Sequence, residues 1–445
     1  MRRIRFSIVA VAALALGLGL GGSALAFHTG GVAECVGCHS MHDPYPGGDN
    51  LLLGGDNSAT CLSCHEHAGD TGPSSYHIST PEAELVAGVS PKQRTPGGDF
   101  GWLHKTYTWL GRGTPPPTEM EEGHSHGHNV VATVGFDSTG VDTTYGYDVD
   151  PVNANAPGGT FLSANLACTS CHDPHGQSRR NLDGTITRPT PGNTDKPITA
   201  SGSYNNTAVP TADTSVGVYR ILAGPGYSVP GASFTGAPDA VAPSTYNQTE
   251  ATNQVKVAYG RSTATGHNTW SEWCGTCHPG MHYDNGAEYV HPTDEPLNGS
   301  TYDNYNAYKK TGDLTGVDTS SFTSLVPVIY NTDVYDGATG LKSKAGNASP
   351  TYAGPDSSSD RVDCLSCHRA HASGWEYGLR WNVEYELLTD PTGLYFNWAG
   401  GGSGQNGFGA RGRTSAEVED SYYDRPSTVF AKSQRQLCNK CHVKD

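Results

Sequence analysis

All twelve cysteines of this 445-residue chain belong to six copies of one short motif. In each copy two residues separate a pair of cysteines and a histidine follows the second cysteine; we call the copies frames one to six. They begin at residues 35, 61, 168, 274, 364 and 438. C-x-x-C-H is the attachment motif of c-type haem, in which both thiols bond to the porphyrin and the histidine becomes the proximal ligand of the iron. The sequence therefore predicts six covalently bound haems.

Each frame assigns three residues to its haem. The predicted thioether bonds use Cys35, Cys38, Cys61, Cys64, Cys168, Cys171, Cys274, Cys277, Cys364, Cys367, Cys438 and Cys441. The predicted proximal ligands are His39, His65, His172, His278, His368 and His442. Disulfides and zinc-binding cysteine pairs are the alternatives, but neither requires a histidine after every second cysteine.

Histidine is also the predicted ligand on the opposite side of each iron. The chain has four methionines, Met1, Met41, Met120 and Met281, which are too few for six irons. Of its 19 histidines, 19 − 6 = 13 remain after the proximal ones are set aside. Ligation by two histidines gives a low reduction potential and leaves no open position for a substrate.

Three histidines follow a proximal histidine by three residues, and each is too near in sequence to reach over its own haem. We expect these three to ligate a neighbouring haem. With four weaker candidates, the distal set is His28, His42, His77, His128, His175, His291 and His371. The sequence leaves open whether His282 or His67 replaces one of them. The remaining histidines, His104, His124, His126 and His267, are expected at the surface, with His124 and His126 in a solvated polar loop.

Residues 1–26 form a predicted secretory signal peptide. Arg2, Arg3 and Arg5 precede an apolar run that ends at Ala-Leu-Ala, residues 24–26, a cleavage pattern of small residues. The exported part is then a single hexahaem domain over residues 27–445, of 445 − 26 = 419 residues. Because the whole sequence has a formal net charge of −16, we do not expect binding to nucleic acid.

The composition predicts a loop-rich fold that depends on its cofactors. Only 35% of the residues are apolar, and glycine and proline number 57 and 28. We expect a multihaem cytochrome c with few short helices, which begin at the frames, minimal strand, and a chain wrapped around a linear array of six haems. The strand candidates are 218–224, 255–260 and 324–330, and 381–389 could be a helical turn or a strand.

Long stretches around the frames resemble the OmcS-type hexahaem outer-surface c-type cytochromes of metal-reducing bacteria. The resemblance rests on strings such as FHTGGVAECVGCHSMH, YKKTGDLTG, CLSCHRAHASG and CNKCHVKD, and it extends from near residue 27 to the end of the chain. It implies an electron carrier that is secreted to the outer cell surface. There it would polymerise into a conductive extracellular filament, or nanowire, along which bis-histidine haems carry electrons.

The resemblance also implies partners. His42 would bridge to the next subunit and cap its fifth haem, which Cys364, Cys367 and His368 hold. Electrons would arrive from other envelope cytochromes and leave to extracellular metal oxides or electrodes. Eight histidines have counterparts in the family, the seven candidates and His282, so at least two of the eight are not ligands.

Two other functions would use the same cofactors. A multihaem reductase enzyme would keep at least one iron open to a substrate, and a monomeric periplasmic electron shuttle would not polymerise. Every frame keeps its histidine and further histidines are plentiful, which favours an electron carrier over an enzyme.

Without haem, the exported chain is expected to stay unfolded, because porphyrin faces replace much of the apolar core. Burial of apolar surface contributes roughly 25 cal/mol per Å², and six rings would supply a large share of it. Circular dichroism and thermal melting of a chain produced without haem attachment test this expectation. A compact apo-protein that melts cooperatively would contradict it.

Overall fold

The structure is a computed structural model of the chain. It describes residues 35–67, 69, 77–111, 114–136, 142–174, 179–180, 186–187, 216–217, 222–224, 227–236, 240–241, 257–261, 269–282, 293–332, 340–345, 354–395 and 410–442. The predicted signal peptide and four histidines, His28, His175, His267 and His291, lie outside the described residues. So does most of the strand candidate 218–224.

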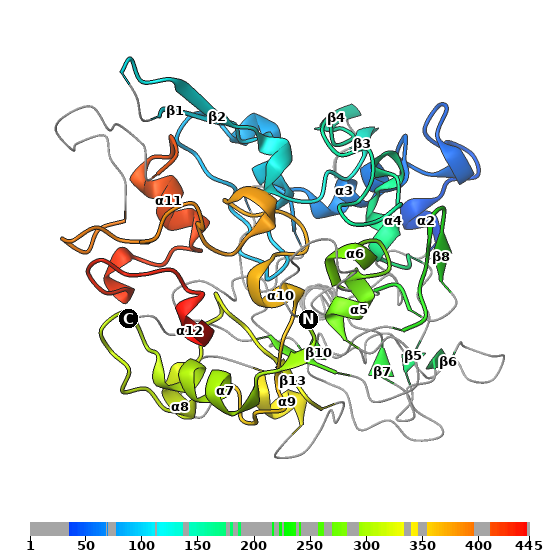
Figure 1. Cartoon of the computed structure of the whole chain (residues 1–445). Helices are drawn as coiled ribbons and strands as arrows, with labels where there is room; N and C mark the ends of the chain where they lie inside the picture. The colour runs from blue at the N-terminus through cyan, green and yellow to red at the C-terminus, as the bar shows by residue number, and fades with distance from the viewer. Residues whose placement is uncertain are drawn as a thin grey trace, which may run out of the picture.

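Most of the helices are short, and many of them carry a frame (Figure 1). The helices that overlap or directly follow the frames are α2 (Cys35–Cys38), α3 (Asn57–His65), α4 (Cys168–Cys171), α5 (Trp270–Cys274), α6 (Pro279–His282), α10 (Cys364–Cys367) and α12 (Asn439–His442). The other α-helices are α7 (Asn298–Ala307), α8 (Asp318–Ser321), α9 (Leu341–Lys344) and α11 (Ser415–Ser421). Single 3-10 turns are η1 (Asp49–Leu51), η2 (Glu82–Glu84), η3 (Phe100–His104), η4 (Gly123–His126), η5 (Ser163–Asn165), η10 (Glu376–Gly378) and η11 (Ser427–Val429).

The strands are short and form small sheets. Antiparallel pairs join β1 (Tyr107–Leu110) to β2 (Thr118–Glu121), β3 (Ala132–Phe136) to β4 (Asp142–Tyr147), and β8 (Ser228–Val229) to β9 (Ala232–Ser233). One sheet has the order β6 (Ile186–Thr187), β5 (Arg179–Arg180), β7 (Val216–Gly217). Another has the order β10 (Ala240–Val241), β11 (Ala258–Gly260), β13 (Ile329–Tyr330), β14 (Arg361–Val362), β12 (Glu295–Pro296).

Polar side chains start several of the frame helices. Asp56 accepts a hydrogen bond from the Ala59 amide at 2.7 Å at the beginning of α3. At α5, Thr269 accepts from the Glu272 amide at 3.1 Å and Glu272 accepts in return from the Thr269 amide at 3.3 Å. Such caps satisfy amides that have no partner within the helix. They help helices persist that are too short to be stable by themselves.

Among the described residues, buried apolar side chains form four clusters, and frame cysteines pack against two of them. The largest includes Trp381 and Tyr422, and Cys367 and Cys441 pack against it. In a second cluster, Phe234 and its neighbours contact cysteines of frames three and four. Because frame cysteines lie at the edges of these clusters, porphyrins bonded to them would continue the apolar core.

The loop-rich character matches the expectation, whereas the strand candidates are met unevenly. Strand β11 falls within the candidate 255–260, but only the last two residues of 324–330, Ile329–Tyr330, form a strand. The segment 381–389 is neither helix nor strand, apart from isolated bridges at Leu387 and Thr389. Single backbone hydrogen bonds hold 381–389 instead, such as the one from the Leu388 amide to the Gln434 carbonyl at 2.6 Å. Within the described residues, no helix has the length and apolar character needed to cross a bilayer.

Candidate haem sites

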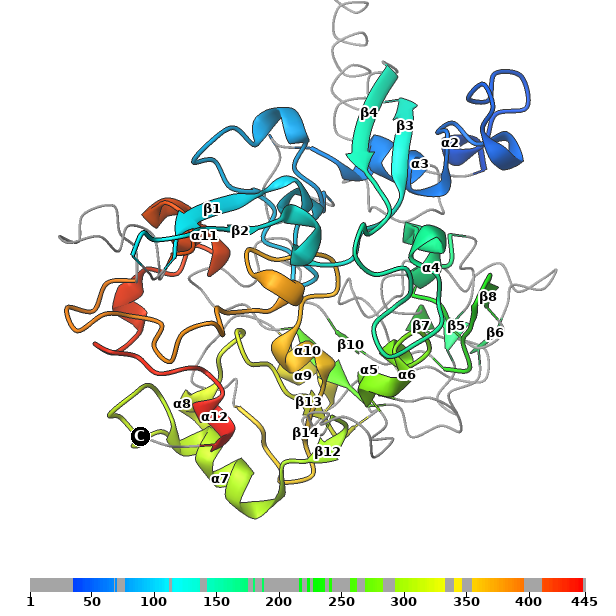
Figure 2. The ribbon, with the colours of Figure 1, turned by 45° about the horizontal axis from the view of Figure 1, so that its top comes forward.

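The frames follow one another through the molecule in the order of the sequence. From α2 through α3, α4, α5 and α10 to α12, the frame helices cross the molecule from one end to the other in both views (Figures 1 and 2). Cysteines of successive frames are neighbours: Cys38 and Cys61, Cys61 and Cys168, Cys171 and Cys277, Cys274 and Cys364, Cys367 and Cys438. The side chains of Cys61 and Cys168 lie in close contact, as do those of Cys274 and Cys364. Groups attached to these cysteines would therefore form one row.

Two proximal histidines each face a candidate distal histidine from a remote segment. The ring centroids of His172 and His371 are 6.4 Å apart, and those of His278 and His128 are 6.0 Å apart. Two imidazoles that bind one metal from opposite sides have centroids about 6 Å apart, since each metal–nitrogen bond is about 2 Å and the centroid lies about 1 Å beyond the nitrogen. Both pairs are therefore spaced to hold one iron between them.

Backbone carbonyls fix the orientation of these rings. His128 Nδ1 donates to the Ala370 carbonyl at 2.7 Å, and His278 Nδ1 donates to the Pro157 carbonyl at 2.9 Å. The same contact is made by His39 with Asn50 at 2.9 Å and by His368 with Tyr377 at 2.8 Å. A histidine that donates from Nδ1 presents the lone pair of Nε2, the atom that metals bind in this arrangement.

Burial keeps the paired histidines neutral. It lowers the pKa of His371 to about 3, helped by the neighbouring His172, and lowers the pKa of His128 to about 4, helped by His278. The pKa values of His278 and His368 are also lowered by burial. Because only neutral imidazole binds a metal, these rings are in the ligating form at neutral pH.

The two candidate distal histidines lie on paired backbone segments. The His128 amide donates to the His371 carbonyl at 2.9 Å, and Gly127 and Ala372 form an antiparallel bridge beside them. Gly98, with φ at +101°, packs so tightly below this bridge that a Cβ atom there would lie 1.8 Å from the Ala372 carbonyl oxygen. The pairing therefore fixes His128 relative to His371.

The other candidate distal histidines in the described residues make different contacts. His77 is buried and its ring stacks on that of His67 with centroids 4.9 Å apart, so both remain possible for one site. His282 Nδ1 lies 3.0 Å from the Thr293 hydroxyl. His42 is exposed on the loop after α2, at the end of the row that frame one occupies.

Comparison with known proteins decides the family. No protein-family model matches the chain. The C-type cytochrome OmcS of Geobacter sulfurreducens is 45% identical over 95% of this chain and 95% of its own length. This chain belongs to the OmcS family of c-type cytochromes.

Solved structures agree with that assignment. Cryo-EM of the OmcS nanowires from Geobacter sulfurreducens gives a chain of 44% identity that superposes with a TM-score of 0.77, over 94% of this chain and all of that one. The outer membrane cytochrome S filament from the same organism gives 43% identity and a TM-score of 0.76, again over 94% and 100%. The predicted family and the loop-rich multihaem fold are confirmed. As an OmcS-type cytochrome the chain binds haem covalently, and it is an electron carrier rather than an enzyme.

The alternative uses of cysteine find no support in the described part of this cytochrome. None of the cysteines in frames two to six forms a disulfide there. Nor do three or more His, Cys, Asp or Glu side chains of the described residues gather around a common metal position.

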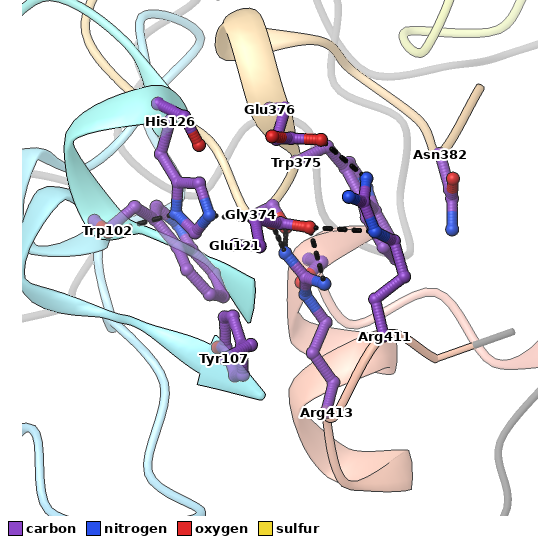
Figure 3. A network of polar contacts seen from close by, with 12 residues as sticks. Trp102, Tyr107, Glu121, His126, Gly374, Trp375, Glu376, Asn382, Arg411 and Arg413 are labelled. Atoms are coloured by element: carbon purple, nitrogen blue, oxygen red, sulfur yellow. Dashed lines mark hydrogen bonds and ion pairs between the residues drawn. The ribbon is translucent and has the colours of Figure 1, made fainter. Parts of the chain in front are cut away.

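The expectation for His126 was wrong, because this histidine is fully buried rather than in a solvated loop. Its Nδ1 donates to the Trp102 carbonyl at 3.0 Å and its Nε2 donates to the Glu121 carboxylate at 2.7 Å (Figure 3). Both nitrogens face protein acceptors, so neither is available to an iron. The polar string HSHGHN gave no sign of this burial.

His124 and His104 also have other partners. His124 makes a partly exposed ion pair with Glu122 at 3.0 Å. His104 is half-buried and its ring lies 4.3 Å from that of Tyr147. Neither lies opposite a proximal histidine in the pairs described above.

An ion network that sequence reasoning missed supports the bridge between His128 and His371. Glu121 is fully buried and binds His126, Arg413 and Arg411, the last at 3.2 Å (Figure 3). Arg413 also donates to the Gly374 carbonyl at 2.5 Å. One carboxylate therefore ties the segment before His128 to the segment after His371.

This network is expected to make stability fall in acid. Burial alone would raise the pKa of Glu121, but the charge of Arg413 and the bonds from His126 and Arg413 outweigh burial and lower the pKa from 4.5 to about 2. A carboxyl with a lowered pKa stabilises the fold fully above the unfolded value and loses that contribution as pH falls toward the folded value. The Glu121 carboxylate therefore contributes on the order of 3 kcal/mol to the free energy of unfolding at neutral pH.

The contribution of Glu121 to the free energy of unfolding can be measured by urea unfolding of the holoprotein and of Glu121→Gln between pH 7 and pH 3. The parent protein should be the more stable at pH 7, and the gap should narrow as pH falls below 4.5. Exposed Glu122→Gln is the matched control and should change little. A gap that is independent of pH would show that Glu121 does not titrate as described.

Proposed function

We propose that this cytochrome is a subunit of an extracellular filament that conducts electrons along six covalently attached haems. The observation that supports it most directly is the pair of histidine couples, His172 with His371 and His278 with His128, at bis-imidazole spacing within an ordered row of frames. Haem iron, when bound, takes up and passes on one electron without making or breaking bonds of a substrate.

The protein's part is to hold, close and insulate each iron. In this proposal the twelve frame cysteines form the thioether bonds and the six frame histidines are the proximal ligands. His371 caps the haem of frame three and His128 caps that of frame four. The four remaining irons would take their distal ligands from His28, His42, His77, His175 and His291, with His67 or His282 as substitutes, so at least one of the five is not a ligand.

Two imidazoles on each iron leave no position for oxygen or a substrate. Buried neutral rings that carbonyls hold in place would move little when the iron changes charge. The reorganisation energy of electron transfer would therefore be small. These are the requirements of a conduit, whereas a reductase needs an open iron.

Polymerisation rests on His42. It lies on the exposed loop after α2, at the frame-one end of the row, where it can reach outside its own chain. Capping the fifth haem of the next subunit would join frame six of one copy to frame one of the next. The relatives' filaments make this arrangement the favoured one over a monomeric shuttle.

Residues 1–26 would direct export, and residues 27–445 would form the single domain that is found at the outer cell surface. Other envelope cytochromes would supply electrons, and metal oxides or electrodes outside the cell would accept them. The acidic surface implied by a net charge of −16 suits neither nucleic acid nor an anionic membrane.

Loss of one distal ligand should open one iron. The holoprotein is expected to exceed the chain mass by six haems and, when reduced, to show almost no carbon monoxide shift. His371→Ala should keep all six haems and bind about one carbon monoxide per chain, because His172 would remain on one side only. His124→Ala is the control and should bind none. A His371→Ala protein with no carbon monoxide shift would remove His371 from the ligand set.

Loss of His42 should block assembly. His42→Ala is expected to yield a monomer with a full set of covalent haems and one five-coordinate iron, because its fifth haem would lack the neighbour's ligand. Electron microscopy shows whether filaments form, and carbon monoxide titration counts open irons. Filaments of normal length with six closed irons would rule out the bridging role.

A further inference from the structure

The same joint occurs twice between successive frames. Frames two and three meet where α3 lies against α4, and frames four and five meet where α5 lies against α10 (Figures 1 and 2). At both places the first cysteine of one frame lies against the first cysteine of the next, Cys61 beside Cys168 and Cys274 beside Cys364. The two joints are formed by different parts of the chain, but a residue of the same type makes the same contact at both.

At each joint, a serine three residues before the first cysteine of one frame binds the first cysteine of the next frame. Ser58 precedes Cys61 by three residues, and its hydroxyl accepts from the amide of Cys168 at 3.1 Å. Ser271 precedes Cys274 by three residues, and its hydroxyl accepts from the amide of Cys364 at 3.3 Å. Three residues are nearly one helical turn, which places the serine beside the cysteine on the same helix face.

Each hydroxyl also reaches the sulfur of the following frame. The Ser271 hydroxyl lies 3.5 Å from Cys364 Sγ, and Ser58 makes the corresponding side-chain contact with Cys168. Both serines are fully buried. The hydroxyl is therefore a fixed spacer inside the protein and does not exchange its partners for water.

Other frames lack this serine. The third residue before the first cysteine is Val32 in frame one, Asn165 in frame three, Arg361 in frame five and Arg435 in frame six. The serine is found only in frames two and four. Each of these even-numbered frames contacts the frame that follows it in the sequence.

We propose that Ser58 and Ser271 are positioning residues for electron transfer from haem to haem at these two joints. Each first cysteine would bond to one edge of its porphyrin, so contact between two such cysteines brings two haem edges together. The serine hydroxyl holds that contact by binding the amide and the sulfur of the second cysteine. The inference rests on the proposed function, because it requires haems at these frames.

The test uses the full holoprotein with Ser58→Ala, Ser271→Ala and the double variant. Ser421→Ala is the matched control, since Ser421 is buried like Ser58 but lies on α11, outside every frame, and its hydroxyl donates to the Glu417 carbonyl at 2.7 Å within that helix. Two readouts are used: the bisignate Soret circular dichroism that arises from coupling between neighbouring haems, and the conductance of single filaments.

In fully loaded protein, Ser58→Ala and Ser271→Ala should each reduce the Soret couplet and lower conductance severalfold, with the largest loss in the double variant. Ser421→Ala should match the parent protein. Ser58→Thr keeps the hydroxyl and should retain the couplet, which separates positioning from simple loss of packing.

An unchanged couplet and unchanged conductance in both alanine variants, with six haems by mass, would overturn the inference even if their melting temperatures fall. Equal losses in Ser58→Thr and Ser58→Ala would also overturn it, because the hydroxyl would then not matter. Failure of the proposed function is recognised separately, since the parent protein itself would then lack six haems or filaments.

Discussion

In the proposed arrangement, the main constraint on this structure is the need to hold two neutral imidazoles on opposite sides of one iron. A frame delivers one imidazole close to its own cysteines, but the other must come from a different segment and arrive at the right distance. For His371 the partner is about two hundred residues away in the sequence, and for His128 it is about one hundred and fifty. Chain segments that are remote in sequence therefore pack together, as the segments of His371 and His128 do with frames three and four.

That requirement also explains how the charged core is built. A loop-rich chain has few ladders of backbone hydrogen bonds, so buried ions take over part of their role. Glu121 with Arg413 and Arg411 joins the segments that carry His128 and His371. Removing one partner from such a network leaves a buried charge uncompensated, which costs far more than the intact pair contributes. The network thus favours one arrangement of the two segments.

Spacing between haems raises a second demand. An electron conduit works only if neighbouring rings stay close, and covalent attachment alone leaves the frames free to separate. Contacts between cysteines of successive frames meet this demand, and at two joints a buried serine adds a hydrogen bond to the next frame. The same short solution, a polar residue one helical turn before the cysteine, is used in both places.

Much of the chemistry could be read from the sequence alone, because it depends on residues that are adjacent in the chain. The C-x-x-C-H spacing predicts attachment and the proximal ligand locally, and the excess of histidine over methionine predicts the type of distal ligand. Tertiary structure decided what depends on distance through space: that His371 faces His172, that His128 faces His278, that the frames form a row in sequence order, and that His126 is buried between Trp102 and Glu121. These outcomes follow from packing between segments far apart in the sequence, and the local pattern around a histidine carries no record of which segment will lie opposite its ring.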